Sequence, residues 1–407
     1  MNILRQGIYL IIFCLPLYLV RLEVFTVPTN VLELAIYGLF VLWLINKGYK
    51  GLWGALKHER LLVWGIVLLI IGVSVATVFS WDLRISAGIW KGWFVDAVLF
   101  FLMFISIIKK ENIKNVFKCL VFSGFIVAII SLVYLIQGNF DYQGRLQGIY
   151  NSPNFLVMAL AIPLILSLWF FLQLLLKTCS RKDTGQRPSE ALPSISASPS
   201  TMRLSLRMVF LVSSFLLLSI LLFFTKSFGA LLGILGALAF GLIIYLYNKD
   251  KKKTALGIII LIFVLALAFG LIKIKSVEGL KSFDARFVIW KTAWESFKLY
   301  PITGIGPGTF QDYFPPYPKW GVPQPHNVFL AFLIQTGIVG FIGFIMLLIW
   351  FFKNGLKLLK TQYSLPLIIL MAYILIHGLV DTTYWKNDLA IMFWLIMGLM
   401  LVIKKEP

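Results

Sequence analysis

The sequence predicts an all-α membrane protein in which about twelve helices cross a bilayer. Hydrophobic residues make up 60% of the 407 residues and charged residues only 13%, which is too few polar groups for the surface of a water-soluble domain. Apolar runs long enough to cross a hydrocarbon core of about 30 Å recur along the chain, separated by short clusters of charged and turn-forming residues. Residues 1–407 are therefore expected to form a single integral membrane domain.

The expected spans follow one another in a simple order. They cover residues 6–20, 31–46, 60–79, 87–108, 115–136, 153–176, 208–224, 228–247, 254–272, 327–352, 364–380 and 388–403. The first run is short and follows Arg5, as in a signal peptide, but Arg21-Leu22-Glu23 stands where small residues of a cleavage site would be needed. It is interpreted as a retained first helix.

The basic residues predict the orientation, because Lys and Arg are enriched in cytoplasmic loops. They concentrate on one side of the expected topology, so both termini are predicted to be cytoplasmic. The net charge of +20 is distributed over many short loops, which suits contact with anionic membrane lipids and indicates no nucleic-acid partner. Cys14, Cys119 and Cys179 have neither the spacing nor the location of a disulfide or metal framework.

Two connections are longer than the rest. Residues 177–207 are polar and low in complexity, and they predict a cytoplasmic linker. Residues 273–326 predict an ordered extracytoplasmic loop that contains an amphipathic helix on the membrane surface. The aromatic face of that helix, at spacings of three and four, consists of Phe283, Phe287, Trp290, Trp294 and Phe297.

Polar side chains suited to chemistry collect on the extracytoplasmic side of this topology. They are Arg145, Lys226, Arg286, His326 and Asp381. Nucleotides are not expected on that face, so a reaction there needs a substrate that is already activated, such as a lipid diphosphate. Cationic side chains can stabilise a leaving diphosphate without a metal or cofactor, and a histidine can accept the proton of an attacking hydroxyl. These residues outline a glycosyl-transfer site.

The segment Pro325-His326-Asn327-Val328-Phe329-Leu330, followed by Gln335-Thr336-Gly337-Ile338-Val339-Gly340, resembles the signature of the O-antigen ligase family. Other pieces agree in order: Gly144-Arg145-Leu146-Gln147-Gly148, Arg286 to Trp290 followed by Pro301, and His377-Gly378-Leu379-Val380-Asp381. The resemblance covers residues 140–400.

The resemblance implies a glycosyltransferase of lipopolysaccharide or surface-polysaccharide assembly in the bacterial inner membrane. Its donor would be an undecaprenyl-diphosphate-linked glycan, and its acceptor a lipid A core or another glycan. By position, His326 matches the catalytic histidine and Arg286 a diphosphate-binding arginine, with Asn327, His377 and Asp381 as supporting residues. A purely structural pairing of His377 with Asp381 is the alternative.

The chain departs from the family pattern at Phe228, where the family often has an arginine between a serine and a glycine. Lys226 or Arg145 would supply the missing charge, although a lysine lacks the bidentate fork of an arginine.

Two alternatives stay open. A polysaccharide polymerase of the same superfamily would use the same carrier, and a transporter or lipid-linked sugar exporter represents another class. Transporters usually place ionisable groups near the midplane of the membrane, whereas here these groups gather at one surface. Within the spans, Lys91 and Asp96 are expected to face the bundle interior or an interface, and two glycine series are expected to bring helices close together. The two series are Gly229, Gly233 and Gly236, and Gly337, Gly340 and Gly343.

Overall fold

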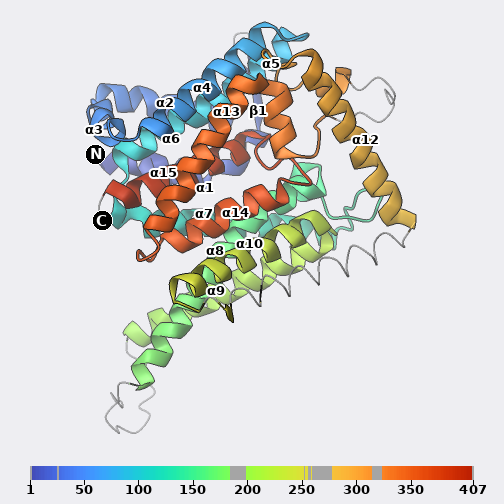
Figure 1. Ribbon diagram of the computed structural model, residues 1–407. Helices are drawn as coiled ribbons and strands as arrows, with labels where there is room; N and C mark the ends of the chain where they lie inside the picture. Colours follow the sequence, from blue (N-terminus) through green and yellow to red (C-terminus); the bar gives the residue numbers. More distant parts are fainter. Residues whose placement is uncertain are drawn as a thin grey trace. The chain divides into compact units, whose positions relative to one another are not determined.

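The computed structural model describes residues 2–24, 27–183, 199–251, 253–254, 258, 277–313 and 323–405 (Figure 1). The elements are α1 (Asn2–Phe13), β1 (Arg21–Val24), β2 (Val27–Asn30), α2 (Val31–Ile45), α3 (Leu52–Leu56), α4 (Arg60–Val78), α5 (Leu83–Ile89), the π-helical segment η3 (Trp90–Val95), α6 (Asp96–Ile107), α7 (Ile113–Ile136), α8 (Pro153–Asp183), α9 (Pro199–Phe224), α10 (Phe228–Asn248), α12 (Val277–Leu299), α13 (Val328–Lys357), α14 (Ser364–His377) and α15 (Asn387–Lys405). Short 3-10 turns lie at Leu15–Leu19, Gly48–Gly51, Lys110–Asn112, Gly148–Tyr150 and Phe310–Tyr313.

The helical membrane class is confirmed, because seven helical segments in the described ranges are long and apolar enough to cross a bilayer. They are Arg60–Val78, Leu83–Ile107, Lys110–Ile136, Pro153–Leu175, Phe228–Asn248, Val328–Lys357 and Asn387–Lys405. Val31–Ile45 and Gly48–Leu56, bent by 82°, would make an eighth span as one unit, and three further apolar helices are shorter: Asn2–Phe13, Met208–Phe224 and Ser364–His377. Most of the expected span 254–272 lies outside the described residues, so the number twelve stays a prediction.

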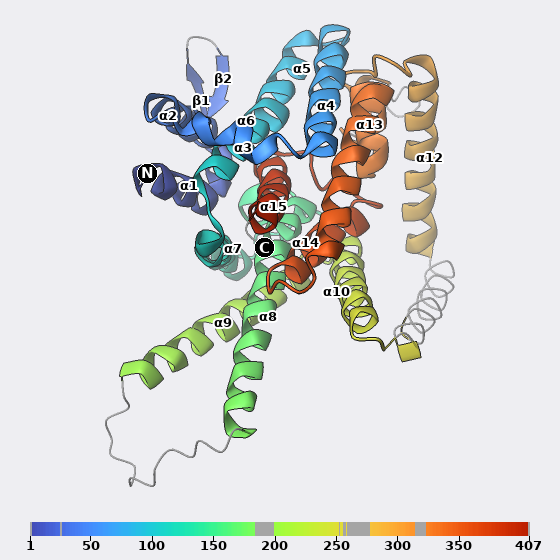
Figure 2. The same ribbon diagram turned by 60° about the vertical axis from the view of Figure 1, so that its left-hand side comes forward.

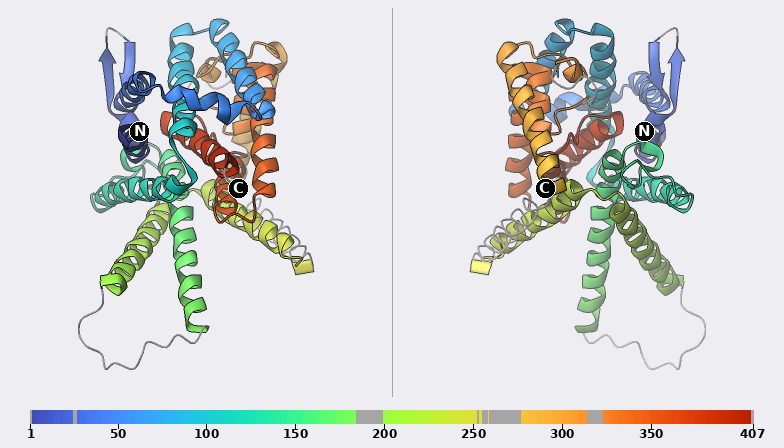
Figure 3. Two further views of the ribbon diagram at one scale, coloured as in Figure 1. Left: turned by 90° about the vertical axis from the view of Figure 1, so that its left-hand side faces the viewer. Right: turned by 90° about the vertical axis from the view of Figure 1, so that its right-hand side faces the viewer.

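One short part of the chain is not helical. Residues 21–30 contain an antiparallel hairpin in which Arg21 pairs with Asn30 and Val24 with Val27. Its two arrows lie beside α2 in Figure 3. Strands of four residues are too short for alternation of polar and apolar residues to indicate them reliably. The hairpin ends at Asn30, whose side chain accepts a hydrogen bond from the Glu33 amide and caps α2.

The chain divides into two compact units. The first contains residues 1–11, 17–113 and 231–407, and the second residues 12–16 and 114–230. In the second unit α8 packs against α9. These helices extend into both ends of the predicted linker 177–207, whose residues 184–198 lie outside the described part of the chain.

The core of the first unit is built around α15, in which every residue from Asp388 to Ile403 is buried. Helices α6 and α14 pack on it, and the ring of Phe101 lies 5.1 Å from that of Trp394. Helix α13 runs alongside α4, as Figures 1 and 2 show from two directions. Helix α15 is therefore the central helix of the first unit.

Glycines allow the close contact of α4 with α13. A side chain at Gly72 would collide with the backbone of Gly340, and one at Gly343 would lie 2.7 Å from the carbonyl oxygen of Gly65. Similarly, a Cβ at Gly233 of α10 would lie 2.7 Å from that of His377. The predicted close approach is confirmed at Gly233, Gly340 and Gly343, and also at Gly236, which faces Ile376.

Gly337 has a different role from the one predicted. Its φ of 65° and ψ of −180° interrupt the helical geometry of α13. The gap admits the loop that follows α12: Ile338 N donates to Pro301 O at 2.9 Å, and Ile305 N donates to Ile334 O at 2.7 Å. The glycine-rich segment after Pro301 therefore packs into the interruption of α13 at Gly337.

Candidate functional site

The candidate site lies where the start of α13 meets the end of α14. Asn327 caps α13 by accepting hydrogen bonds from the amides of Phe329 and Leu330, both at 3.0 Å. Its side-chain amide also donates to Leu379 O at 3.0 Å, and Val328 N donates to Gly378 O at 2.7 Å. These bonds bring together two segments about fifty residues apart in the sequence.

His326 precedes this cap and has a φ of 46°, which is the left-handed region. Residues other than glycine rarely adopt that conformation, and such strained positions concentrate at functional sites. The strained backbone directs the ring toward Asp381: Nδ1 of His326 lies 3.3 Å from Oδ1 of Asp381. The histidine side chain keeps 34% of its surface exposed, whereas Asp381 keeps 7%, so the ring can reach a substrate while its partner is sheltered.

Asp381 is held as an anion by its neighbours. Burial acts to raise the pKa of Asp381, but the hydrogen bond and charge of His326 and the amide of Thr382 outweigh it, so the pKa lies below its ordinary value. The Thr382 amide donates to Oδ1 at 2.8 Å. A buried carboxylate that contacts one ring nitrogen of a histidine fixes the orientation of the ring and leaves the other nitrogen for chemistry.

His377 does not share this exposed position. It is 1% exposed, and its Nδ1 lies 3.0 Å from the hydroxyl of Tyr373. Backbone bonding links the two predicted supporting residues, since Asp381 N donates to His377 O at 3.1 Å. The buried His377 therefore supports the turn that carries Asp381 through its backbone carbonyl.

Arg286 lies on α12, which packs directly against α13. Ile289 and Ala293 of α12 form an apolar cluster with Ile305, Phe310 and Ile334. The side chain of Arg286 is half-buried and interacts electrostatically with His377. The structure therefore brings Arg286 to the same end of α14 as His326 and Asp381.

The predicted aromatic face of α12 is divided. Phe287 and Trp294 are exposed by 62% and 49%, whereas Trp290 and Phe297 pack on the cluster with α13. The side chain of Phe283 lies outside the described part of the structure. Only the outward residues are available to contact a membrane surface, and that contact stays a prediction.

Arg145 and Lys226 belong to the second unit, where they lie close together. Leu146 N donates to Phe224 O at 2.9 Å, which joins the Arg145 loop to the end of α9. A Cβ placed on Gly144 would lie 3.4 Å from Nζ of Lys226. Lys226 has a left-handed φ of 48° in the turn between α9 and α10. The two candidate replacements for the missing arginine thus form one basic cluster.

Arg145 is paired within this loop. Its Nε lies 3.0 Å from Oδ2 of Asp141, and its amide donates to Oδ1 at 2.8 Å. Burial acts to raise the pKa of Asp141, but the bonds from Arg145 and from the Gln143 amide hold it below its ordinary value. The Asp141 carboxylate therefore orients the guanidinium of Arg145 and compensates part of its positive charge.

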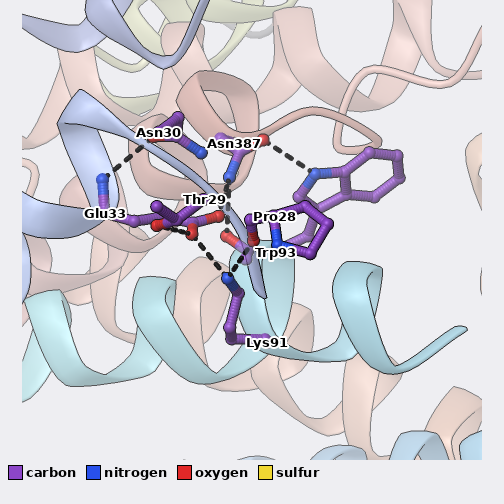
Figure 4. Close-up of polar contacts among 8 residues, drawn as sticks. Pro28, Thr29, Asn30, Glu33, Lys91, Trp93 and Asn387 are labelled. Atoms are coloured by element: carbon purple, nitrogen blue, oxygen red, sulfur yellow. Dashed lines mark hydrogen bonds and ion pairs between the residues drawn. The ribbon is translucent and has the colours of Figure 1, made fainter. Parts of the chain in front are cut away.

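A polar cluster that the sequence analysis missed lies at the start of α15 (Figure 4). Glu33, which is 5% exposed, forms an ion pair of 2.8 Å with Lys91 and accepts a hydrogen bond of 3.1 Å from Asn387. Trp93 donates to Asn387 at 3.0 Å, and Lys91 donates to Pro28 O at 2.8 Å. Opposite charges near the predicted ends of two different spans were the signal that would have revealed this pair.

The comparisons with known proteins agree with the motifs. Residues 213–345 match a family model described as O-antigen ligase. This part of the chain includes Lys226, Arg286 and His326, and its similarity to the O-antigen ligase family is thereby confirmed. No curated protein matches the chain. The fold and the match together are those of a helical membrane protein whose residues 213–345 are similar to the O-antigen ligase family.

Proposed function

We propose that the protein transfers a glycan from an undecaprenyl-diphosphate carrier to an acceptor hydroxyl at the extracytoplasmic face of the bacterial inner membrane, as an O-antigen ligase does. The observation that carries this proposal is the pairing of His326 with Asp381 beside the cap of α13. A half-exposed histidine with a sheltered carboxylate partner is suited to general base catalysis. The family match supports the same class of reaction.

In the proposed reaction the acceptor oxygen attacks the anomeric carbon of the donor. The bond between that carbon and the diphosphate breaks, the carrier diphosphate leaves with the bonding electrons, and the acceptor proton moves to His326. Because Nδ1 faces Asp381, Nε2 would receive the proton. Attack opposite the leaving group inverts the anomeric configuration.

The leaving diphosphate needs positive charge, and Arg286 is the proposed donor-binding residue of the first unit. A guanidinium can bind two phosphate oxygens at once and stabilise the charge that develops on the leaving group. The basic cluster of Arg145 and Lys226 in the second unit is likewise proposed to bind diphosphate. It would replace the arginine that the family often has at the position of Phe228.

The decisive experiment measures transfer in proteoliposomes with an undecaprenyl-diphosphate glycan, supplying either a lipid A core or a second carrier-linked repeat. His326→Ala is expected to lower the rate by about a hundred to ten thousand fold. Product on the lipid A core would identify a ligase, and a ladder of longer carrier-linked chains a polymerase. Unchanged transfer by correctly inserted His326→Ala would refute the assignment of the base.

The diphosphate role of Arg286 is tested separately. Arg286→Lys keeps the charge but removes the bidentate fork, so weaker donor binding is expected. Lys291→Met is the matched control, because Lys291 is exposed on the same helix. Equal donor binding by wild type and Arg286→Lys would argue that Arg286 only anchors α12 at the headgroups. Movement of the donor across the membrane without any transfer would favour the exporter alternative.

A further inference from the structure

Gln335 is a fully buried residue of α13, two positions before the break at Gly337. Both ends of its side-chain amide are bonded. Oε1 accepts hydrogen bonds from Gly308 N at 2.7 Å and from Trp385 Nε1 at 3.0 Å. Nε2 donates to Oε1 of Gln324 at 2.8 Å. One amide therefore joins three separate segments of the first unit.

Each of these segments leads to a residue of the candidate site. Gln324 stands two residues before His326, and Trp385 stands four residues after Asp381. Gly308 belongs to the loop that follows α12, the helix of Arg286. Because hydrogen bonds are directional and strong inside an apolar core, the amide constrains the separation of all three segments.

The position of Gln335 itself is determined by its surroundings. Phe332, one turn earlier in α13, packs its ring at 4.7 Å from that of Trp385. The loop wedged at Gly337 is bonded to the backbone on both sides of Gln335, at Ile334 and Ile338. The side chain thus has little freedom to follow its partners if they move.

We propose that Gln335 is a positioning residue that sets the geometry between His326 and Asp381 without touching the substrate. This inference deepens the proposed function and rests on it. The expected consequence is that removing the amide lowers kcat while leaving donor KM nearly unchanged, since the helix of Arg286 stays packed on α13 through the apolar cluster of Ile289, Ala293 and Ile334. A misplacement of about 1 Å at reacting groups can cost on the order of a hundredfold in rate.

Three variants test the proposal. Gln335→Leu removes all three bonds at similar volume. Gln335→Glu keeps an acceptor for Gly308 N and Trp385 Nε1, and the Gln324 amide can rotate to donate to it, so partial rescue of kcat is expected. Thr336→Val is the matched control, because the equally buried hydroxyl of Thr336 donates to Phe332 O at 2.7 Å within α13.

A spectroscopic measurement separates positioning from general stability. The chain contains three histidines, so ring signals of labelled histidine in nanodiscs can be assigned with His326→Ala. In Gln335→Leu the His326 signals are expected to move toward those of Asp381→Asn, whereas in Thr336→Val they should stay at the wild-type positions. If Gln335→Leu is poorly folded, Gln324→Met removes only the bond nearest His326 and supports the same comparison.

The inference is overturned if folded Gln335→Leu keeps wild-type kcat and wild-type His326 signals, or if Thr336→Val loses as much activity. It is also overturned if Gln335→Glu gives no rescue relative to Gln335→Leu. A wild-type protein without transfer activity on any donor would instead refute the proposed function, and the ring signals would still decide whether Gln335 positions His326.

Discussion

The amide of Val328 donates to the carbonyl of Gly378 at 2.7 Å, and this single backbone bond joins the first residue of α13 to the residue that follows α14. His326 lies two residues before the donor and Asp381 three residues after the acceptor. The bond explains how a histidine and an aspartate 55 residues apart come within 3.3 Å. The side chain at residue 378 must be absent for it to form.

Gly378→Ala is expected to separate His326 from Asp381, because a Cβ would lie 2.6 Å from Cγ1 of Val328 and 2.9 Å from Oγ1 of Thr383. Transfer measured in proteoliposomes should fall, by on the order of a hundredfold for a shift of about 1 Å. Gly88→Ala is the control, since a Cβ at Gly88 meets no atom within 4 Å. Equal activity of the two variants would contradict this explanation of the site.

Asp381→Asn is expected to lower the free energy of unfolding by about 1.5 to 3 kcal/mol near neutral pH, because the anion loses its charge-assisted bonds. The pKa of Asp381 in the folded protein lies below its ordinary value. The contribution is therefore present above the unfolded pKa of about 3.9 and is lost as the pH falls through the folded pKa. Thermal unfolding of wild type and variant from pH 7 to pH 3 measures it. A stability gap that widened in acid would show that the carboxylate is not held as an anion.

Gly337→Ala is expected to destabilise the protein by more than about 1 to 2 kcal/mol, which is the usual cost of a left-handed backbone for an L-residue. The added methyl group would also collide with the carbonyl oxygen of Ile302, and φ at this position is 65°. Gly38→Ala in α2 is the control, because open space surrounds that Cβ and alanine favours the helix by up to about 1 kcal/mol. Chemical unfolding in detergent compares the two. Equal stability of Gly337→Ala and Gly38→Ala would argue that the loop after Pro301 does not require a glycine at position 337.

Lys91→Met is expected to cost about 3 to 5 kcal/mol, since it leaves the carboxylate of Glu33 buried without its ion-pair partner. Adding Glu33→Gln should recover much of that loss, because a neutral amide needs no counter-charge. The stabilities of both single variants and of the double variant form a mutant cycle that isolates the coupling. Additive losses would mean that the ion pair contributes no coupling energy.

Parts of the fold could be predicted from the sequence because a membrane span is recognised from the hydrophobicity of consecutive residues. The apolar run that forms α4 is visible in the sequence without knowledge of any neighbouring helix. The glycines at 340 and 343 were similarly visible as small residues suited to helix packing. The hairpin at residues 21–30 was not, because strands of four residues carry no clear periodicity.

By itself the sequence determined that this is a helical membrane protein, and its motifs singled out His326 and Arg286 as candidates. Only the tertiary structure decided that His326 adopts a left-handed backbone, that Asp381 rather than His377 faces its ring, and that Gln335 joins the surrounding segments. The physical reason is the range of the forces involved. Partition into a membrane depends on consecutive residues, whereas a directional hydrogen bond between distant segments depends on how whole helices pack.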